Sequence, residues 1–211
     1  QSDKISWTVI AAPSKQWARK VFPELPEEKQ VEALWDAIFK ATRADLDNPV
    51  EAWAQHNDNL HEKVDYLNNK NYAKLHYTAP GTDLTIELPK GHLWCGAGSI
   101  NEKGEEFMAN MPTEEVFTVP HKDGVNGYVS TTKPLSYGGN IIDNFKLTFE
   151  NGRIVQVEAA QGEEVLKNLV ATDEGSHYLG EVALVPFHSP ISQSNILFYN
   201  TLFDENASNH L

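Results

Sequence analysis

The chain has 211 residues, 40% of them hydrophobic and 10% aromatic, which is enough to bury a sizeable core in one large domain or in one domain and part of another. Its 17 basic and 30 acidic side chains give a formal net charge of -13, which repels nucleic acid and anionic membrane surfaces and attracts cations. These totals argue against a nucleic-acid partner.

The cysteine and hydropathy patterns indicate a cytoplasmic location. Cys95 is the one cysteine of the sequence, so it cannot form an internal disulfide, and a lone thiol is typical of a reducing compartment. The sequence shows no charged-then-apolar signal segment and no apolar run near the roughly 18 residues of a membrane span, so we expect no membrane partner. The missing initiator Met suggests that the front of the chain is cut.

The first third of the chain predicts a short strand and then helices. Residues 4–12 carry apolar side chains in a strand-like run, and Ser14 is a candidate N-cap for a first helix. Pro26 and the two acids after it open a second helix over residues 27–42, because Pro suits the first turn and acids favour its positive end. A third helix follows Pro49. A strand followed by helices is α/β in style.

After residue 68 the apolar period changes from helical to alternating, and we place a domain boundary there. Two hairpins are predicted, one around Pro80-Gly81 and one around Asn151-Gly152, each between alternating runs. The remaining predicted elements are a strand over 128–132, a short helix over 162–170 and an apolar strand over 178–187. The predicted fold class is therefore α+β, with residues 1–68 helical and residues 69–211 mixed and β-rich.

Three glutamates stand in apolar surroundings. Glu114 and Glu115 are adjacent in a strand-like context, where neighbouring residues point to opposite faces, so only one of them faces a given cleft. Glu181 interrupts the apolar run over 178–187. A buried ionised carboxylate is costly unless it is paired or bound to a cation. On the residues alone a salt bridge to Lys or Arg is the more ordinary of these two explanations.

The end of the chain passes abruptly from apolar residues into Asp204, Glu205 and His210, whose carboxylate and imidazole side chains are typical metal ligands. Asp204 or Asn206 is placed to cap a helix, so that Glu205 and His210 lie near its positive end. By composition alone, such an acidic cluster is usually a solvated cap. Because isolated helices below about 12 to 15 residues are marginal in water, the sequence suggests that the chain is cut at Leu211.

Four blocks of this sequence resemble one family. They are Met111-Pro-Thr-Glu-Glu-Val-Phe117, Gly127-Tyr-Val-Ser-Thr-Thr132, Glu174-Gly-Ser-His-Tyr-Leu-Gly-Glu181 and Leu202-Phe-Asp-Glu-Asn-Ala-Ser-Asn-His210. In order and spacing they resemble the aminopeptidase T and aminopeptidase S (PepS) family of thermophilic-type metallo-aminopeptidases. The resemblance covers essentially the whole chain. It implies that residues 1–68 are the C-terminal portion of an N-terminal α/β domain, and that residues 69–211 are a metallopeptidase catalytic domain.

Carried over by motif, the resemblance implies a dimetal site. Glu115 would be a metal ligand, Glu181 would bridge two divalent ions, and Glu205 and His210 would complete the ligands present in this chain. Carboxylates with imidazole suit Zn, Co, Mn or Mg, and a shared carboxylate holds two cations about 3.5 to 4 Å apart. Such a pair lowers the pKa of a bound water and polarises a carbonyl.

The group that moves a proton to the leaving amine stays open between Glu114 and Glu115. A residue does not easily serve as both ligand and base, so Glu114 is the candidate catalytic residue.

The implied activity is that of a cytoplasmic, homodimeric aminopeptidase that hydrolyses the N-terminal peptide bond of peptides. The Tyr and the His-x-Asp ligand pair of such proteins would lie beyond Leu211, so the chain is expected to be an inactive fragment. The alternative is a non-catalytic acidic β-rich module that binds a partner protein or a cation such as Ca. Ca takes oxygen ligands only, so a binding role for His210 would argue against that module.

Overall fold

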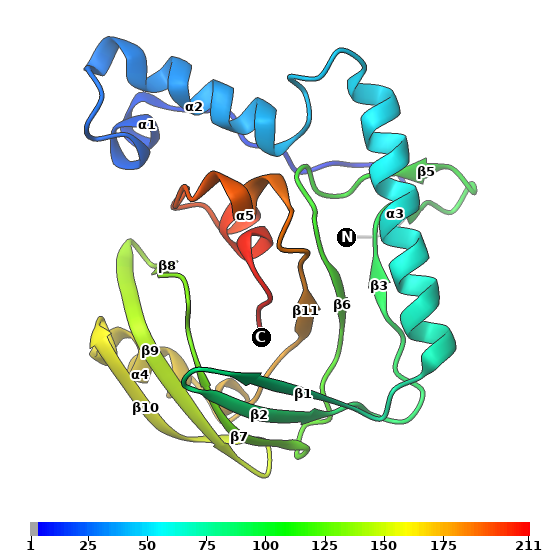
Figure 1. Cartoon of the computed structure of the whole chain (residues 1–211), viewed down its shortest axis with the longest axis vertical. Helices are drawn as coiled ribbons and strands as arrows, with labels where there is room; N and C mark the ends of the chain where they lie inside the picture. Colours follow the sequence, from blue (N-terminus) through cyan, green and yellow to red (C-terminus); the bar gives the residue numbers. More distant parts are fainter. Residues whose placement is uncertain (1–3) are drawn as a thin grey trace. The chain divides into compact units, whose positions relative to one another are not determined.

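Three helices open the computed structural model, which describes residues 4–211 (Figure 1). They are α1 (Lys15–Val21), α2 (Glu27–Ala41) and α3 (Pro49–Lys70). The predicted cap of α1 is confirmed, because the Ser14 Oγ accepts a hydrogen bond from the Trp17 N–H at 3.2 Å. The predicted helix over 27–42 is confirmed as α2, with Thr42 as its C-cap. No helix within this described range is long and apolar enough to cross a membrane.

The predicted strand over residues 4–12 is wrong. Val9 alone forms an isolated parallel bridge with Asn110, in which the Val9 N–H donates to the Ala109 carbonyl at 2.7 Å and the Met111 N–H donates to the Val9 carbonyl at 3.0 Å. Since the neighbouring apolar side chains Ile5 and Ile10 stay exposed, the run lacks the paired backbone and the buried face that define a strand.

The described chain folds into two compact units. Unit 1 consists of the residues up to Asp65 with 95–116 and 184–209, and unit 2 consists of 66–94, 117–183 and 210–211. The first crossing lies close to the predicted domain boundary, but the chain then returns to unit 1 twice. The division of the sequence at residue 68 into two domains stays a prediction, because compact units need not coincide with the domains of a family.

The core of unit 1 joins α2 to the C-terminal part of the chain. Leu34 and Ile38 of α2 are buried with Ile191, Phe198 and Phe203. The rings of Phe198 and Phe203 stack with centroids 4.7 Å apart. Burying each such side chain stabilises the fold by about 1.5 to 3 kcal/mol, so this cluster fixes the C-terminal end of unit 1, residues 184–209, against the first helices of that unit. That end contains α5 (Pro190–Ser194), α6 (Thr201–Asp204) and the 3₁₀ helix η2 (Glu205–Ala207).

The stretch 95–118 supplies short strands. They are β3 (Cys95–Gly96), β4 (Ser99–Ile100), β5 (Glu106–Phe107) and β6 (Val116–Thr118). β3 and β6 belong to a three-stranded sheet of order β11-β6-β3, whose third member is β11 (Val182–Leu184). The chain passes from one unit to the other within β6 and within β11.

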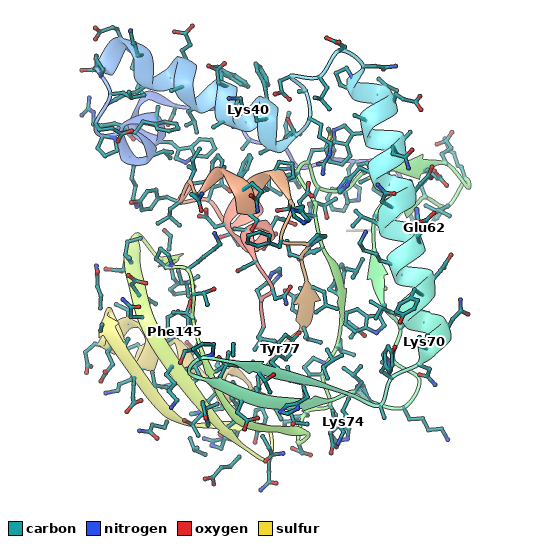
Figure 2. The ribbon with its side chains drawn as sticks, in the orientation of Figure 1. Lys40, Glu62, Lys70, Lys74, Tyr77 and Phe145 are labelled. Atoms are coloured by element: carbon teal, nitrogen blue, oxygen red, sulfur yellow. The ribbon has the colours of Figure 1, made fainter. Side chains whose placement is uncertain are left out.

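A six-stranded antiparallel sheet dominates unit 2, and its main path runs β1-β2-β7-β9-β10, with β8 beside β9. Its strands are β1 (Lys74–Ala79), β2 (Thr82–Glu87), β7 (Val125–Ser130), β8 (Leu135–Tyr137), β9 (Asn140–Glu150) and β10 (Arg153–Gln161), and α4 (Glu163–Val170) and the 3₁₀ helix η1 (Gly175–His177) follow. Figure 2 marks Tyr77 on β1 and Phe145 on β9 of this sheet. Burial raises the pKa of Tyr77 to about 12, so its hydroxyl stays protonated.

Both predicted hairpins are confirmed. β1 and β2 pair with Tyr77 opposite Leu84, and β9 and β10 pair with Leu147 opposite Val157. The α+β fold class is confirmed as well, since helices and an antiparallel sheet occupy different parts of the chain.

Two predicted strands have other limits than the sequence indicated. The strand over 128–132 is β7, which begins at Val125 and ends at Ser130. The strand over 178–187 shrinks to β11, because η1 precedes it and Pro186, which has no N–H to donate, follows it.

The turn between β9 and β10 requires a glycine for two reasons. Gly152 has φ 81°, and a Cβ there would lie 1.7 Å from the Lys122 carbonyl oxygen. We expect Gly152→Ala to lower the free energy of unfolding by about 3 kcal/mol or more, because left-handed strain adds to a backbone clash.

Gly91→Ala is the matched control, since Gly91 has the same φ of 81° and nothing lies within 4 Å of its Cβ position. It should cost only about 1 to 2 kcal/mol. Urea denaturation of both variants measures the difference, and equal losses would contradict the clash.

Candidate metal centre

Glu114 lies in a buried ion pair in unit 1. Its Oε1 accepts from Arg43 Nη1 at 2.5 Å and its Oε2 accepts from Arg43 Nη2 at 2.9 Å, which is the bidentate geometry of an arginine fork. The Glu114 side chain is 2% exposed and that of Arg43 is 16% exposed. Of the two explanations for a carboxylate in apolar surroundings, the salt bridge therefore applies to Glu114.

His56 of α3 adjoins this ion pair. Its Nε2 lies 2.7 Å from the Thr113 carbonyl oxygen and 3.6 Å from Glu114 Oε1. Burial lowers the pKa of His56 below 6.5, more strongly than the negative charge of Glu114 raises it. The imidazole is thus neutral near pH 7 and donates its Nε2–H to the Thr113 carbonyl.

Glu115 follows directly in the chain, and its side chain is partly buried. β6 begins only at Val116, so neither glutamate lies within a strand, and the strand-like context predicted for them is wrong. The Glu114 N–H instead donates to the side-chain oxygen of the distant Asn206 at 2.7 Å, so a side-chain amide takes the place of a strand partner.

Glu205 opens η2 and is partly buried. Asp204 occupies the N-cap position of η2 but makes no capping hydrogen bond there, and the predicted cap at Asn206 is wrong because Asn206 lies inside η2. The helix α6 begins earlier, and Asn200 caps it by accepting from the Leu202 N–H at 3.1 Å. Asp204 instead accepts the Phe198 and Asn200 N–H groups at 2.7 and 2.9 Å. Burial raises the pKa of Asp204 above its usual value, although these backbone N–H groups oppose the shift.

Glu181 and His210 come together in unit 2. The His210 Nε2 lies 3.5 Å from the Glu181 Oε1, and the two side chains are 22% and 45% exposed respectively. An antiparallel bridge holds His210 in place, since it exchanges backbone hydrogen bonds of 2.9 and 3.2 Å with Ala183. Glu181 is therefore not the deeply buried carboxylate that the apolar run over 178–187 suggested.

The separation of these two donor atoms suits a shared cation. With Zn–N and Zn–O bonds of about 2.0 to 2.2 Å, two ligands of one tetrahedral ion lie about 3.4 Å apart. The observed 3.5 Å is close to that value and longer than the roughly 2.7 to 3.2 Å of a direct hydrogen bond. The chemistry of the donors, carboxylate and imidazole, fits a divalent transition metal.

The predicted ligands fall into two pairs, Glu115 with Glu205 in unit 1 and Glu181 with His210 in unit 2. Between residues 4 and 211, no group of three or more His, Cys, Asp or Glu side chains is close enough to hold a metal ion. Among these four predicted ligands, Glu181 and His210 lie close together, with the 3.5 Å separation given above, and the roles of all four as ligands stay predictions.

Comparison with known proteins decides the family. The family model described as "Thermophilic metalloprotease (M29)" matches residues 1–211. The chain belongs to this M29 family. Its resemblance to metallo-aminopeptidases, which rested on four sequence blocks, is thereby confirmed, and the description of the family implies the use of divalent metal.

Several M29 relatives are named aminopeptidases. Aminopeptidase AmpS of Bacillus subtilis is 72% identical over 211 residues, which are 100% of this chain and 52% of that protein. Aminopeptidase T of Thermus thermophilus is 50% identical over 206 residues, 98% of this chain and 50% of that protein. A solved structure of AmpT from the same organism matches with a TM-score of 0.91 and 48% identity, over 96% of this chain and 50% of that one. The chain spans about half the length of these relatives.

The sequence did not reveal Arg43, His56 and Asn206 as neighbours of the predicted site. Arg43 lies 71 positions before Glu114 and Asn206 lies 92 positions after it. The one sequence signal was indirect: a glutamate between apolar residues needs a partner, but nothing in the pattern says which arginine supplies it.

Removal of the Arg43 guanidinium should lower the stability of the fold. We expect Arg43→Met to lower the free energy of unfolding by about 3 to 5 kcal/mol, because it leaves the Glu114 carboxylate buried without its cation. Adding Glu114→Gln to this variant should recover part of the loss, since the uncompensated charge disappears.

The control for this pair is Arg19→Met. Arg19 pairs with Glu27 at the surface, where both side chains are more than 60% exposed (64% and 65%), so this variant should change stability by less than about 1 kcal/mol. Chemical denaturation of the three variants measures the losses, and an Arg43→Met loss no larger than that of Arg19→Met would refute the prediction.

His56 should make stability depend on pH. Because its pKa is lowered in the folded state, the unfolded chain binds a proton here at a higher pH than the folded chain does. The stability that the fold gains from a neutral His56 is therefore present above about pH 6.5 and is lost as the pH falls through the pKa of His56 in the folded state.

Denaturation at several pH values from about 7.5 to 5.5 tests this, with His56→Gln as the non-titrating reference. The stability of the unsubstituted protein relative to His56→Gln should decline toward the acid end. A difference that stays constant over this range would show that the fold does not disfavour protonation of His56.

Proposed function

We propose that the full-length protein is a metal-dependent aminopeptidase that hydrolyses the N-terminal peptide bond of peptides. The observation that carries this proposal is the match of the M29 family model to residues 1–211. It is supported by the aminopeptidase names of relatives that are 50% to 72% identical over nearly the whole chain.

In this proposal Glu115, Glu181, Glu205 and His210 bind two divalent ions, with Glu181 as the bridging ligand. Three carboxylates and one imidazole suit Zn, Co, Mn or Mg. The 3.5 Å separation of Glu181 Oε1 and His210 Nε2 supports a common cation. When bound, such ions polarise the scissile carbonyl and lower the pKa of the attacking water.

The residues of the chain supply the remaining steps. The acidic surface, with a net charge of -13, attracts the cationic amino terminus of a peptide, and carboxylates near the reacting bond would bind that amine. Glu114 remains the proposed proton carrier to the leaving amine. Its bidentate contact with Arg43 restricts that role, because both carboxylate oxygens already accept hydrogen bonds.

Cytoplasmic location and a homodimeric state belong to the same proposal. The location follows from Cys95, the lone and exposed thiol of the sequence, and the dimer follows from the family resemblance alone.

The activity should depend on metal. The full-length protein is expected to release leucine from a leucyl anilide, to lose this activity in a chelator and to regain it with Co or Zn. Glu181→Ala should lower hydrolysis by about 100-fold or more and reduce the bound metal, because a bridging carboxylate serves both ions. Anilide cleavage and elemental analysis measure the two quantities.

Glu158→Ala is the control, because Glu158 is an exposed carboxylate of the same unit outside the predicted site. It should leave hydrolysis and metal content unchanged. If the folded protein is inactive with every metal, the non-catalytic acidic module becomes the better account. Loss of cation binding in His210→Ala would then speak against a Ca site, because Ca uses oxygen ligands.

A further inference from the structure

Two predicted ligands of unit 1 are connected by one hydrogen bond between their chain neighbours. Glu114 immediately precedes Glu115, and Asn206 immediately follows Glu205. The Glu114 N–H donates to the Asn206 Oδ1 at 2.7 Å, although the two residues are 92 positions apart. This bond therefore joins the backbone that carries Glu115 to the backbone that carries Glu205.

The Asn206 side chain is held on both sides of its amide. It is 1% exposed, and its Nδ2 donates to the Leu202 carbonyl at 3.1 Å while its Oδ1 accepts from Glu114. Its own carbonyl accepts from the Ser189 Oγ at 3.2 Å. A buried amide whose donor and acceptor both have partners has one preferred orientation, so it fixes the distance between the two segments.

The segment before Glu115 is fixed from two more elements. Arg43, which follows α2, holds the Glu114 side chain, and His56 of α3 holds the Thr113 carbonyl. On its other side, Glu115 meets Gly96, where a Cβ would lie 2.7 Å from the Glu115 carbonyl oxygen. The glycine permits this close approach of the backbone.

Glu205 has comparable support. The residue before it, Asp204, accepts the Phe198 and Asn200 N–H groups, and the residue after it is Asn206. The neighbours of both glutamates thus use their side chains to hold backbone or an ion pair, which fixes the backbone that carries Glu115 and Glu205.

We propose that Asn206 is a positioning residue that sets the separation of the Glu115 and Glu205 carboxylates for metal binding. The inference rests on the proposed function, because it takes these two glutamates as ligands. Asn206 itself touches neither substrate nor metal in this account, and it acts through the Glu114 backbone.

The test measures Co binding to the full-length protein by titration and by the visible absorption of the bound ion, which reports ligand geometry. Asn206→Leu keeps the approximate volume and removes both hydrogen bonds. We expect it to weaken Co binding by about 10- to 100-fold and to alter the absorption spectrum, as is typical when support of a metal ligand is lost.

Asn68→Leu is the matched control. The Asn68 side-chain amide also binds distant backbone, since it accepts from the Trp94 N–H at 2.8 Å and donates to the Trp94 carbonyl at 3.0 Å. No predicted metal ligand is next to Asn68 or Trp94 in the sequence. It should cost stability and leave Co binding unchanged. If Asn206→Leu weakens binding no more than this control does, the positioning role is refuted.

Asn206→Asp provides the rescue, because its carboxylate still accepts the Glu114 N–H and loses only the donation to Leu202. An added carboxylate can raise cation affinity by itself, so the spectrum decides: a return to the unsubstituted spectrum supports positioning, and the spectrum of the Leu variant refutes it.

Should Asn206→Leu fail to fold, Asn206→Gln decides in its place, since it retains the amide and displaces it by one methylene. Weakened Co binding by the folded Gln variant supports the proposal, and unchanged binding overturns it. Absence of binding of Co, Zn, Mn and Mg alike in the unsubstituted protein would refute the proposed function itself, and positioning with it. That result differs from normal metal binding that the Asn206 substitutions leave unchanged, which would refute the positioning role alone.

Discussion

The buried ion pair of Arg43 and Glu114 constrains unit 1 more than any other polar contact described above. A carboxylate that is 2% exposed is stable only with a well-placed cation, and the guanidinium fork provides two hydrogen bonds to it. Arg43 has φ 58°, a left-handed conformation that does not continue the helix α2 and is unusual for a residue with a Cβ. The surrounding contacts hold it there, since the guanidinium also lies 5.7 Å from the Trp53 ring centroid.

Apolar packing brings distant parts of the chain to this ion pair. Phe198 and Phe203 are buried against α2, and the Trp17 Nε1 donates to the Phe198 carbonyl. These contacts fix the segment 184–209, and Asn206 then reaches the Glu114 backbone. The order of causes runs from hydrophobic burial, which is non-directional, to a few directional bonds, which set the final orientation.

The local structure could be predicted well from the sequence. Ser14, Pro26 and the Asn151-Gly152 turn each act on residues next to them in the sequence, so the elements they start or join were predicted correctly. The predicted strand over 4–12 failed because a strand needs a paired partner, and only Val9 forms a bridge, whereas the strand over 178–187 is present but shortened to β11. The candidate ligands Glu115, Glu181, Glu205 and His210 were chosen from the sequence blocks and stay predictions. The contacts that Arg43 and Asn206 make with Glu114 join residues 71 and 92 positions apart, and no sequence pattern indicated them.

The dipeptide Glu114-Glu115 shows why adjacent identical residues need not share a task. Two carboxylates at one metal site repel each other, and the repulsion grows where water is excluded. In this fold the Arg43 guanidinium compensates the charge of Glu114, so the ion pair is formally neutral. A cation bound by Glu115 would then meet one formal negative charge from this dipeptide and not two. The fold thus separates the two glutamates by chemistry: the Glu114 side chain forms an ion pair with Arg43, and Glu115 is the one proposed to bind metal.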